Sequence, residues 1–336
     1  MTTNQDFLDN PLMFMRRTPV SPPDGSIGTL LKTWKVKENR IAEGALNSVM
    51  EDGVHVAPIS HVSGGARVQF ADFTRHGKFP DAKTLTLSPA RTSLDQIPIH
   101  WLPWKTLKIV SASIPAVPRN LVEADEDENP RFFFTAGING CSVFVKGPPT
   151  KPTLYHAGID GKLAEDAGAF WREQLETATK GTHMNLEQTL GEVNRNDYMK
   201  RDSQAIQDYL KWVQSGSNNP FTVEVINNFG CVFGMRFGHH WSFYLQESAL
   251  IETAKFLTRK EVRKTDGARV EKSTGFAVTK QTFTSSRRLG PIPLPRKSNS
   301  VYASTHQRCV TFRVSEIFPN RHWAGELKDI INAHVM

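Results

Sequence analysis

Two apolar segments joined by a glycine-rich turn constrain this chain more than any other feature. Residues 131–145 read Arg-Phe-Phe-Phe-Thr-Ala-Gly-Ile-Asn-Gly-Cys-Ser-Val-Phe-Val, and a Gly/Pro-rich turn then leads into an apolar segment that carries His156. Aromatic and β-branched residues favour strands, and glycine and proline favour the turns between them. The pattern therefore predicts consecutive strands that bring His156 back beside Cys141.

A thiol beside an imidazole is the minimum apparatus for thiolate catalysis. The other interpretation makes Cys141 a small buried hydrophobic residue and His156 an ordinary strand residue. Spacing alone leaves both interpretations open, because one cysteine and a separate histidine form only a candidate pair.

Three aromatic motifs surround this pair in a fixed order. Residues 100–105 read His-Trp-Leu-Pro-Trp-Lys, residues 170–172 read Phe-Trp-Arg, and residues 241–246 read Trp-Ser-Phe-Tyr-Leu-Gln. In this order the chain resembles the Burkholderia lethal factor-like glutamine deamidase toxins, which are related to the catalytic domains of the cytotoxic necrotizing factors. The resemblance covers roughly residues 40 to 250.

The resemblance assigns roles to residues around the turn. The family motif Leu-Ser-Gly-Cys corresponds to Ile-Asn-Gly-Cys at residues 138–141, so two of its four positions differ. The resemblance implies that Cys141 is the nucleophile, and the turn with Asn139 and Gly140 is expected to help its backbone N–H stabilise an oxyanion. Isoleucine keeps an apolar anchor, and Asn139 keeps a short polar side chain suited to a turn.

Two further residues complete the expected catalytic set. His156 corresponds to the family's catalytic histidine and is expected to act as base and then as acid. Thr135 occupies the third active-site position by resemblance, where it would orient the histidine. Without the resemblance, Thr135 would be interpreted as an ordinary strand threonine.

The function implied is protein glutamine deamidation through a thioester on Cys141, a hydrolase reaction that requires no metal and no organic cofactor. A transglutaminase would use the same thioester with an amine in place of water. From a different class, the chain would be a non-catalytic adaptor on the same fold. Cysteine protease activity has no precedent in the resemblance.

The resemblance also implies a setting and partners for such a reaction. It implies a secreted virulence effector that acts in the host cytoplasm on a translation-initiation RNA helicase, hence as a translation inhibitor, or on a Rho-type GTPase. The chain starts Met-Thr-Thr-Asn-Gln-Asp, which lacks a classical signal peptide, so residence in the bacterial cytoplasm before export by another route is expected. A monomer with no transmembrane segment and no required nucleic acid is expected.

The expected fold class is α/β, a mixed β-sheet sandwich with flanking helices that is similar to the cytotoxic necrotizing factor catalytic domain. Prolines at 19, 22 and 23 predict a flexible N-terminal segment over residues 1–39. The deamidase domain is expected over 40–254. The patterns within it predict helices over 41–50, 166–178 and 203–214, and strands over 221–226 and 230–245, the last interrupted at Gly238.

Residues 255–336 form the third predicted region, a basic C-terminal extension. They hold 16 Lys and Arg against 6 Asp and Glu, a balance of +10, and since the whole chain carries +7, residues 1–254 carry −3. One hypothesis is an electrostatic docking surface for an acidic partner. The alternatives are a solvated surface, or a segment whose apolar residues, such as Val310 and Phe312, complete the core.

The remaining cysteines and charges predict less. Three cysteines without a Cys-x-x-Cys pair support neither a disulfide framework nor a zinc site, and Cys231 and Cys309 are interpreted as buried thiols. The acidic run over 123–128 is interpreted as a solvated loop. Trp101 and Trp104 are expected in the core, whereas Trp241 with Ser242 and Gln246 are candidates for a substrate groove.

Overall fold

The protein is described by a computed structural model. Its described residues are 2–23, 37–40, 50–51, 54–55, 60–65, 67–104, 108–117, 126–158, 172, 190–199, 204, 206–208, 211, 221–256, 277–281 and 301–319. Among them the bounded helices are few and short: α1 (Thr3–Asp9), α2 (Pro11–Arg17) and α5 (Arg195–Tyr198). Strands supply nearly everything else.

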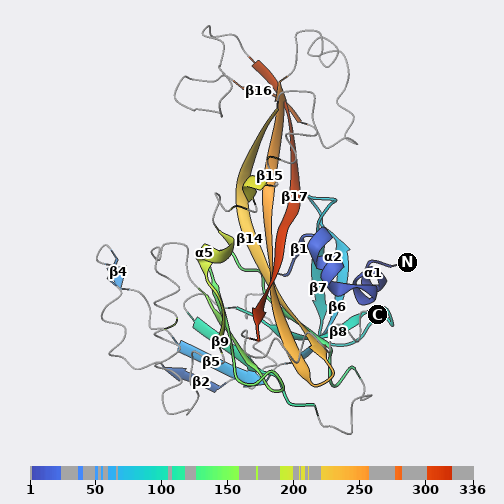
Figure 1. The fold of residues 1–336 in the computed structure, drawn as a ribbon, viewed down its shortest axis with the longest axis vertical. Helices are drawn as coiled ribbons and strands as arrows, with labels where there is room; N and C mark the ends of the chain where they lie inside the picture. Colours follow the sequence, from blue (N-terminus) through green and yellow to red (C-terminus); the bar gives the residue numbers. More distant parts are fainter. Residues whose placement is uncertain are drawn as a thin grey trace.

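One large mixed sheet runs through the molecule. Its nine described strands, in order across the sheet, are β1 (Val20–Ser21), β7 (Lys83–Ser88), β6 (Arg67–Arg75), β8 (Ile97–Leu102), β10 (Phe132–Thr135), β14 (Phe221–Phe237), β15 (His240–Phe256), β17 (Val301–Phe318) and β16 (Ala277–Gln281). Strands β8 and β10 are parallel, whereas β14, β15 and β17 form a long antiparallel ribbon along the long axis (Figure 1).

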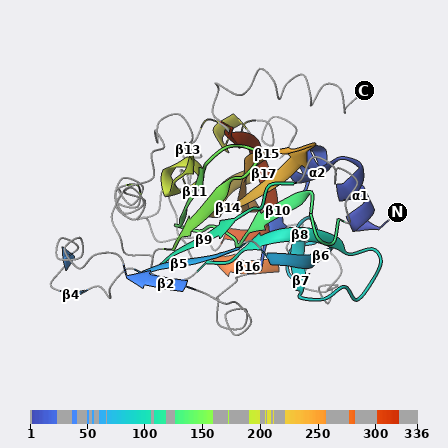
Figure 2. The ribbon, with the colours of Figure 1, turned by 90° about the horizontal axis from the view of Figure 1, so that it is seen from below.

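A second mixed sheet lies on the side of the first that faces away from α1 and α2 (Figure 2). Its described strands, in order, are β13 (Leu190–Val193), β11 (Ser142–Lys146), β12 (Thr153–Ala157), β9 (Lys108–Ser113), β5 (Ser60–Gly65) and β2 (Lys37–Arg40). A separate short hairpin pairs β3 (Met50–Glu51) with β4 (Val54–His55). The prediction of a sheet-dominated mixed α/β fold is confirmed at this level.

All four residues of strand β10 are buried, which places this strand in the middle of the packing. Successive strand side chains point to opposite faces. Phe132 and Phe134 pack with the N-terminal helices, and Phe133 packs against the second sheet. This burial on both faces explains an unbroken apolar run in place of an alternating one. Two hydrophobic layers therefore sandwich the large sheet.

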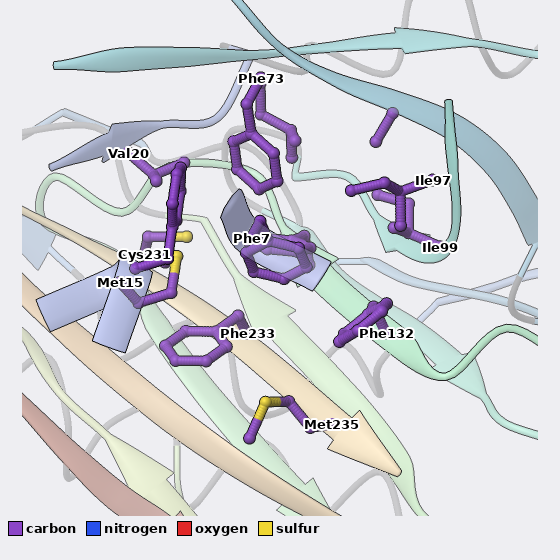
Figure 3. Close-up of a cluster of buried hydrophobic side chains, with 14 of the residues drawn as sticks. Phe7, Met15, Val20, Phe73, Ile97, Ile99, Phe132, Cys231, Phe233 and Met235 are labelled. Atoms are coloured by element: carbon purple, nitrogen blue, oxygen red, sulfur yellow. The ribbon is translucent and has the colours of Figure 1, made fainter. Parts of the chain in front are cut away.

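The layer beneath the helices is rich in aromatic side chains. Phe7 of α1 contacts Phe73 and Phe132, with ring centroids 4.8 and 4.9 Å apart, and Met15 of α2 is fully buried in the same cluster. Figure 3 shows these side chains meeting Cys231 and Phe233 of β14. Trp101 belongs to this layer too, so its predicted core position is confirmed.

The N-terminal residues correct the predicted flexible segment over 1–39. Residues 3–21 form two helices and a strand instead, and the strand extends the large sheet beside β7. The side chain of Thr2 caps α1 and the side chain of Asn10 caps α2. Pro19, Pro22 and Pro23, the prolines that suggested a linker, lie after the end of α2 and interrupt no helix.

The C-terminal residues correct the boundary predicted at 254/255. Strand β15 continues to Phe256, and β17 pairs with it over the length of the ribbon. Phe318 is buried between the two sheets, and Cys309 is also buried. Part of the basic extension therefore completes the core, as one of the sequence-based alternatives held.

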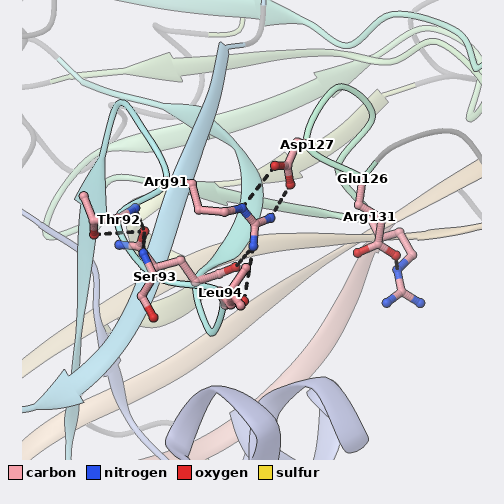
Figure 4. Close-up of polar contacts among 8 residues, drawn as sticks. Arg91, Thr92, Ser93, Leu94, Glu126, Asp127 and Arg131 are labelled. Atoms are coloured by element: carbon pink, nitrogen blue, oxygen red, sulfur yellow. Dashed lines mark hydrogen bonds and ion pairs between the residues drawn. The ribbon is translucent and has the colours of Figure 1, made fainter.

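The described part of the acidic run, residues 126–128, is a largely exposed turn, as predicted, and two of its carboxylates form ion pairs. Asp127 forms a two-pronged ion pair with Arg91, and Glu126 pairs with Arg131 at 2.7 Å (Figure 4). Arg91 also donates to the backbone carbonyls of Leu94 and Gln96. The acidic residues thus fasten the loop after β7 to the segment that leads into β10.

The other predicted elements have mixed outcomes. The strands expected over 221–226 and before Gly238 are one continuous strand, β14, and the predicted break at Gly238, whose φ of +57° favours glycine, is confirmed. The described residues of the helix expected over 203–214 are helical. The helices expected over 41–50 and 166–178 fall almost entirely outside the described residues.

Candidate active site

The hairpin of β11 and β12 places Cys141 and His156 on one face of the second sheet. Val143 lies directly opposite His156 in the antiparallel register. Cys141 precedes Val143 by two residues, so both point to the same face, and they share one hydrophobic cluster. Cys141, one residue before β11 begins, therefore lies diagonal to His156 on the same face, but no hydrogen bond joins the thiol to the ring nitrogens of His156.

His156 is fully buried, and its two ring nitrogens have no hydrogen-bond partner among the described residues. Burial lowers the pKa of His156 to about 3, because an apolar surrounding disfavours the charged imidazolium. The imidazole is therefore neutral at physiological pH. A neutral ring can accept a proton from a thiol, but burial makes it a weak base in this closed arrangement.

Thr135 belongs to the large sheet, at the end of β10 opposite Leu102 of β8. It is fully buried and points to the same side as Phe133, towards the second sheet. Its hydroxyl donates to the carbonyl of Ala136 at 2.8 Å. Thr135 and His156 thus face the same layer between the sheets, but no hydrogen bond joins them within the described structure.

The turn before Cys141 is held at several points. Ile138 exchanges backbone hydrogen bonds with Gly230 of β14, at 3.0 and 2.9 Å. A Cβ on Gly230 would lie 2.8 Å from the side chain of Ile138, so a larger residue there would displace the turn. Gly140 has a φ of +107°, a conformation that L side chains rarely adopt, and Asn139 is exposed at the tip.

Tyr198 of α5 binds the turn with its hydroxyl. The hydroxyl accepts a hydrogen bond from the N–H of Gly140 at 2.8 Å and donates one to the carbonyl of Cys141 at 2.7 Å. Burial raises the pKa of Tyr198 well above its usual value, and charge on Cys141 would raise it further. Tyr198 therefore stays protonated, and the N–H of Gly140 is already engaged.

Helix α5 is fastened beside the turn by its first residues. The N–H of Asn194 donates to the carboxylate of Asp197 at 2.6 Å, half of a capping box. The hydroxyl of Ser142 donates to the side-chain carbonyl of Asn194 at 3.1 Å. Asn194 also bonds to Glu192, which pairs with Arg172.

Sequence reasoning missed Tyr198 and Asn194, although the chain carries a signal for them. Asn followed three residues later by Asp at 194–197 marks a helix start. That start would have placed Tyr198 one turn further on. Nothing in the sequence pattern, however, indicates that this turn packs on Cys141, because the contact spans 57 residues.

The thiol lies in an apolar environment. Cys141 is 5% exposed and packs with Ile138, Val143, Tyr198 and other residues of one hydrophobic cluster. The protein's three cysteines form no disulfide. Burial raises the pKa of Cys231 and raises that of Cys309 to about 12, in line with their interpretation as buried thiols.

The prediction that Trp241, Ser242 and Gln246 line one substrate groove is wrong, because all three side chains are buried and Ser242 and Gln246 point to the other face of β15. Trp241 is buried between the sheets, with its ring centroid 5.7 Å from that of His100. Gln246 lies on the opposite face of β15, fully buried, and is bonded to the N-terminal segment. Ser242 shares that opposite face and is also fully buried.

Comparison with known proteins finds no family model that matches the chain and no curated protein that matches it in sequence. None of the described helices has the length and apolar character needed to cross a membrane. In the described part of the chain, no group of three or more His, Cys, Asp or Glu side chains is arranged to hold a metal ion.

Proposed function

We propose that the protein is a cysteine-dependent glutamine deamidase with a catalytic domain of the cytotoxic necrotizing factor type. The observation that carries the proposal is the placement of Cys141 and His156 as diagonal neighbours on one face of the β11–β12 hairpin. Thiolate catalysis needs a base close to the thiol, and this placement puts the two residues on one face, although no hydrogen bond joins them in the resting structure. Thr135 faces the same layer from the other sheet, and the proposal assigns its hydroxyl the role of accepting a hydrogen bond from the imidazole.

The proposed reaction begins with transfer of the Cys141 proton to His156. The thiolate attacks the carboxamide carbon of a glutamine side chain, and the tetrahedral intermediate expels ammonia, which takes the proton from His156. Water then adds to the thioester with His156 as base, the carbon–sulfur bond breaks, and glutamate is released as the thiol recovers its proton. The balance is one glutamine and one water giving one glutamate and one ammonia.

In this proposal the structure represents the resting state, because Cys141 and His156 are both buried. His156 has no exposed surface and Cys141 has 5%, so a glutamine side chain reaches the thiol only after local opening. Opening admits polar groups and weakens the burial that lowers the pKa of His156. The imidazole then becomes a stronger base at the moment when substrate arrives.

The substrate proposed is a host protein, with the chain acting as an exported effector in the host cytoplasm. Support comes from the resemblance of residues 100–105 and 241–246 to the deamidase toxins, whose targets are a translation-initiation RNA helicase or Rho-type GTPases. The same resemblance supports a toxin that inhibits translation. The substrate's identity rests on this likeness of sequence.

One observation favours a second candidate, a non-catalytic binding protein. The two nitrogens of His156 have no hydrogen-bond partner in the described structure, and the surrounding cluster is apolar. A histidine kept only for packing has this environment. The adaptor would use its surface, and Cys141 and His156 would be core residues.

Conversion of glutamine separates these candidates. Host-cell lysate incubated with the protein is digested, and glutamines that become glutamate are mapped by the mass increase of one amide-to-acid change. A deamidase converts specific glutamines, Cys141→Ser abolishes the conversion, and Cys231→Ser leaves it intact. A larger adduct on glutamine would indicate a transglutaminase, and no change at any glutamine would support the adaptor.

A further inference from the structure

The hydroxyl of Tyr198 marks a point where one donor and one acceptor of the backbone converge. The N–H of Gly140 points at the hydroxyl oxygen from 2.8 Å, and the carbonyl of Cys141 receives its proton over 2.7 Å. The two backbone groups belong to the nucleophile and to the residue before it. The convergence therefore lies at the proposed reaction centre.

A primary carboxamide carries the same pair of functions as a tyrosine hydroxyl. Its oxygen accepts a hydrogen bond and its NH₂ group donates two. A carboxylate carries acceptors alone, and its oxygen would face the carbonyl oxygen of Cys141 without a proton between them. A tertiary amide keeps the acceptor and lacks the donor. The backbone pair thus complements a primary carboxamide better than either alternative.

We propose that the N–H of Gly140 and the carbonyl of Cys141 form a carboxamide-binding subsite, which the hydroxyl of Tyr198 occupies in the resting protein. The positive φ of Gly140 supports this assignment, because it sets the backbone so that both groups reach one atom. Among the described residues, only the chain neighbours of Gly140 approach its Cβ position within 4 Å, which leaves room on that side of the turn.

Tyr198 can leave this position by a local movement. It is the only buried residue of the four in α5, so displacement of the helix exposes one large side chain. The polar links to be exchanged include those from Tyr198 to the turn, from Ser142 to Asn194, and from Asn228 to the carbonyl of Tyr198 at 3.3 Å. An entering carboxamide replaces the bonds that the hydroxyl gives up.

The subsite would give the enzyme a means to release its product. Deamidation replaces the NH₂ donor with a carboxylate oxygen, which the carbonyl of Cys141 repels. Return of the Tyr198 hydroxyl then restores both hydrogen bonds. That glutamine is the occupant during turnover rests on the proposed function, whereas the preference for a carboxamide follows from the backbone pair itself.

Two alkylating reagents test the subsite without any substrate protein. Iodoacetamide is a primary carboxamide, and 2-iodo-N,N-dimethylacetamide is a neutral tertiary amide that cannot donate. In each reaction the cysteine sulfur displaces iodide, and peptide mapping gives the rate at each cysteine. Free cysteine in the same buffer gives the reference ratio of the two rates. Cys231, which is fully buried in the other layer, reports global unfolding in the same sample.

The decisive variant is Tyr198→Ala, with Tyr244→Ala as the control for loss of a buried tyrosine remote from the turn. We expect Tyr198→Ala to raise the iodoacetamide rate at Cys141 about tenfold over the unmodified sequence, with Cys231 unchanged. The alkylation rate with iodoacetamide divided by the rate with the dimethyl amide should be about fivefold higher at Cys141 than for free cysteine. This factor is the equivalent of one hydrogen bond of about 1 kcal/mol. The Tyr244→Ala control should leave Cys141 slow.

Tyr198→Phe, which removes the hydroxyl alone, carries the same ratio test if the alanine variant unfolds and Cys231 reacts as fast as Cys141. A ratio equal to that of free cysteine in a folded variant overturns the subsite. A raised ratio in a protein that converts no glutamine keeps the subsite and refutes the deamidase. Conversion of glutamine without a raised ratio supports the deamidase and refutes the subsite.

Discussion

The side chain of Gln246 accepts a hydrogen bond from the backbone N–H of Val20 at 3.0 Å, across 226 positions of the sequence. Its amide nitrogen donates to the carbonyl of Thr18 at 2.8 Å and also to that of Met15. One fully buried glutamine of β15 therefore satisfies three backbone groups of the N-terminal segment. This relationship makes residues 3–21 part of the folded domain.

Replacing Gln246 by leucine should destabilise the protein strongly. Each buried backbone group left without a partner costs about 1–3 kcal/mol, so we expect a loss of at least about 3 kcal/mol in the free energy of unfolding. Urea denaturation measures the loss. Gln307→Leu is the matched control, since Gln307 bonds to Glu252 in an exposed position, and it should shift stability by less than about 0.5 kcal/mol. Equal effects of the two variants would contradict the anchoring role.

The sequence was sufficient to predict the strands that surround the candidate site. The run of three phenylalanines before Thr135 and the alternation from residue 221 onward both indicate strands, and both are found. The hairpin that carries Cys141 and His156 was predicted from its Gly/Pro-rich turn. In the structure, Gly147 of this turn has a φ of +101°, a conformation that glycine adopts readily. Local patterns of this kind depend only on neighbours in the chain.

Contacts between distant segments were beyond such patterns. The buried hydrogen bonds of Gln246 and the clamp by Tyr198 join residues 226 and 57 positions apart, and no periodicity encodes them. The basic balance of residues 255–336 likewise left open whether they dock a partner or complete the core, and only the pairing of β17 with β15 decides for the core. The domain boundary predicted at 254/255 was wrong because the local excess of basic residues indicated a separate segment, whereas the pairing of β15 with β17 depends on residues far apart in the sequence.

Acid should destabilise the protein through its buried histidines. Burial lowers the pKa of His156 to about 3, and burial together with the charge of Arg236 lowers that of His100 to about 4. In the unfolded chain these two histidines have the ordinary pKa of about 6.5, so between about pH 4 and 6.5 they hold more protons there than in the folded protein. Stability therefore falls as pH drops through this window, and above it the histidines contribute no dependence.

The dependence is measured by urea midpoints between pH 4.5 and 7.5. Each histidine contributes a slope of up to about 1.4 kcal/mol per pH unit. His156→Met keeps an apolar side chain of similar size and should flatten the slope by one histidine's share. An unchanged slope in that variant would show that His156 can be protonated within the fold.

Coupling between Cys141 and His156 should appear in the reactivity of the thiol. His156→Gln keeps a polar side chain but removes the base, so we expect alkylation of Cys141 near neutral pH to slow about tenfold or more. Peptide mapping after iodoacetamide treatment measures the rate. His100→Gln is the matched control, because it alters a buried imidazole of the large sheet and should leave Cys141 unaffected. The pairing is refuted if both variants behave alike from pH 6 to 9.

Removal of the residues after 256 tests whether the basic extension is a separate docking segment. The truncation deletes β17, which pairs with β15 along the ribbon and supplies Phe318 to the layer between the sheets. We expect insoluble protein or loss of the cooperative unfolding transition. Phe318→Ala alone should cost about 3–5 kcal/mol, the usual range for a buried phenylalanine, whereas Gln307→Ala at an exposed position of the same strand should cost little.

Docking by the basic extension is therefore testable only by charge neutralisation in the full-length chain. Arg287, Arg288, Arg296 and Lys297 form two basic pairs around a proline-rich stretch, and their replacement by glutamine removes four positive charges. If the extension binds an acidic partner, the variant should bind its target more weakly at low salt, with a flatter dependence on ionic strength, because screening acts on charge contacts. Conversion of glutamine at saturating target should be unchanged. Binding of unaltered strength and salt dependence would leave this basic stretch with no part in docking.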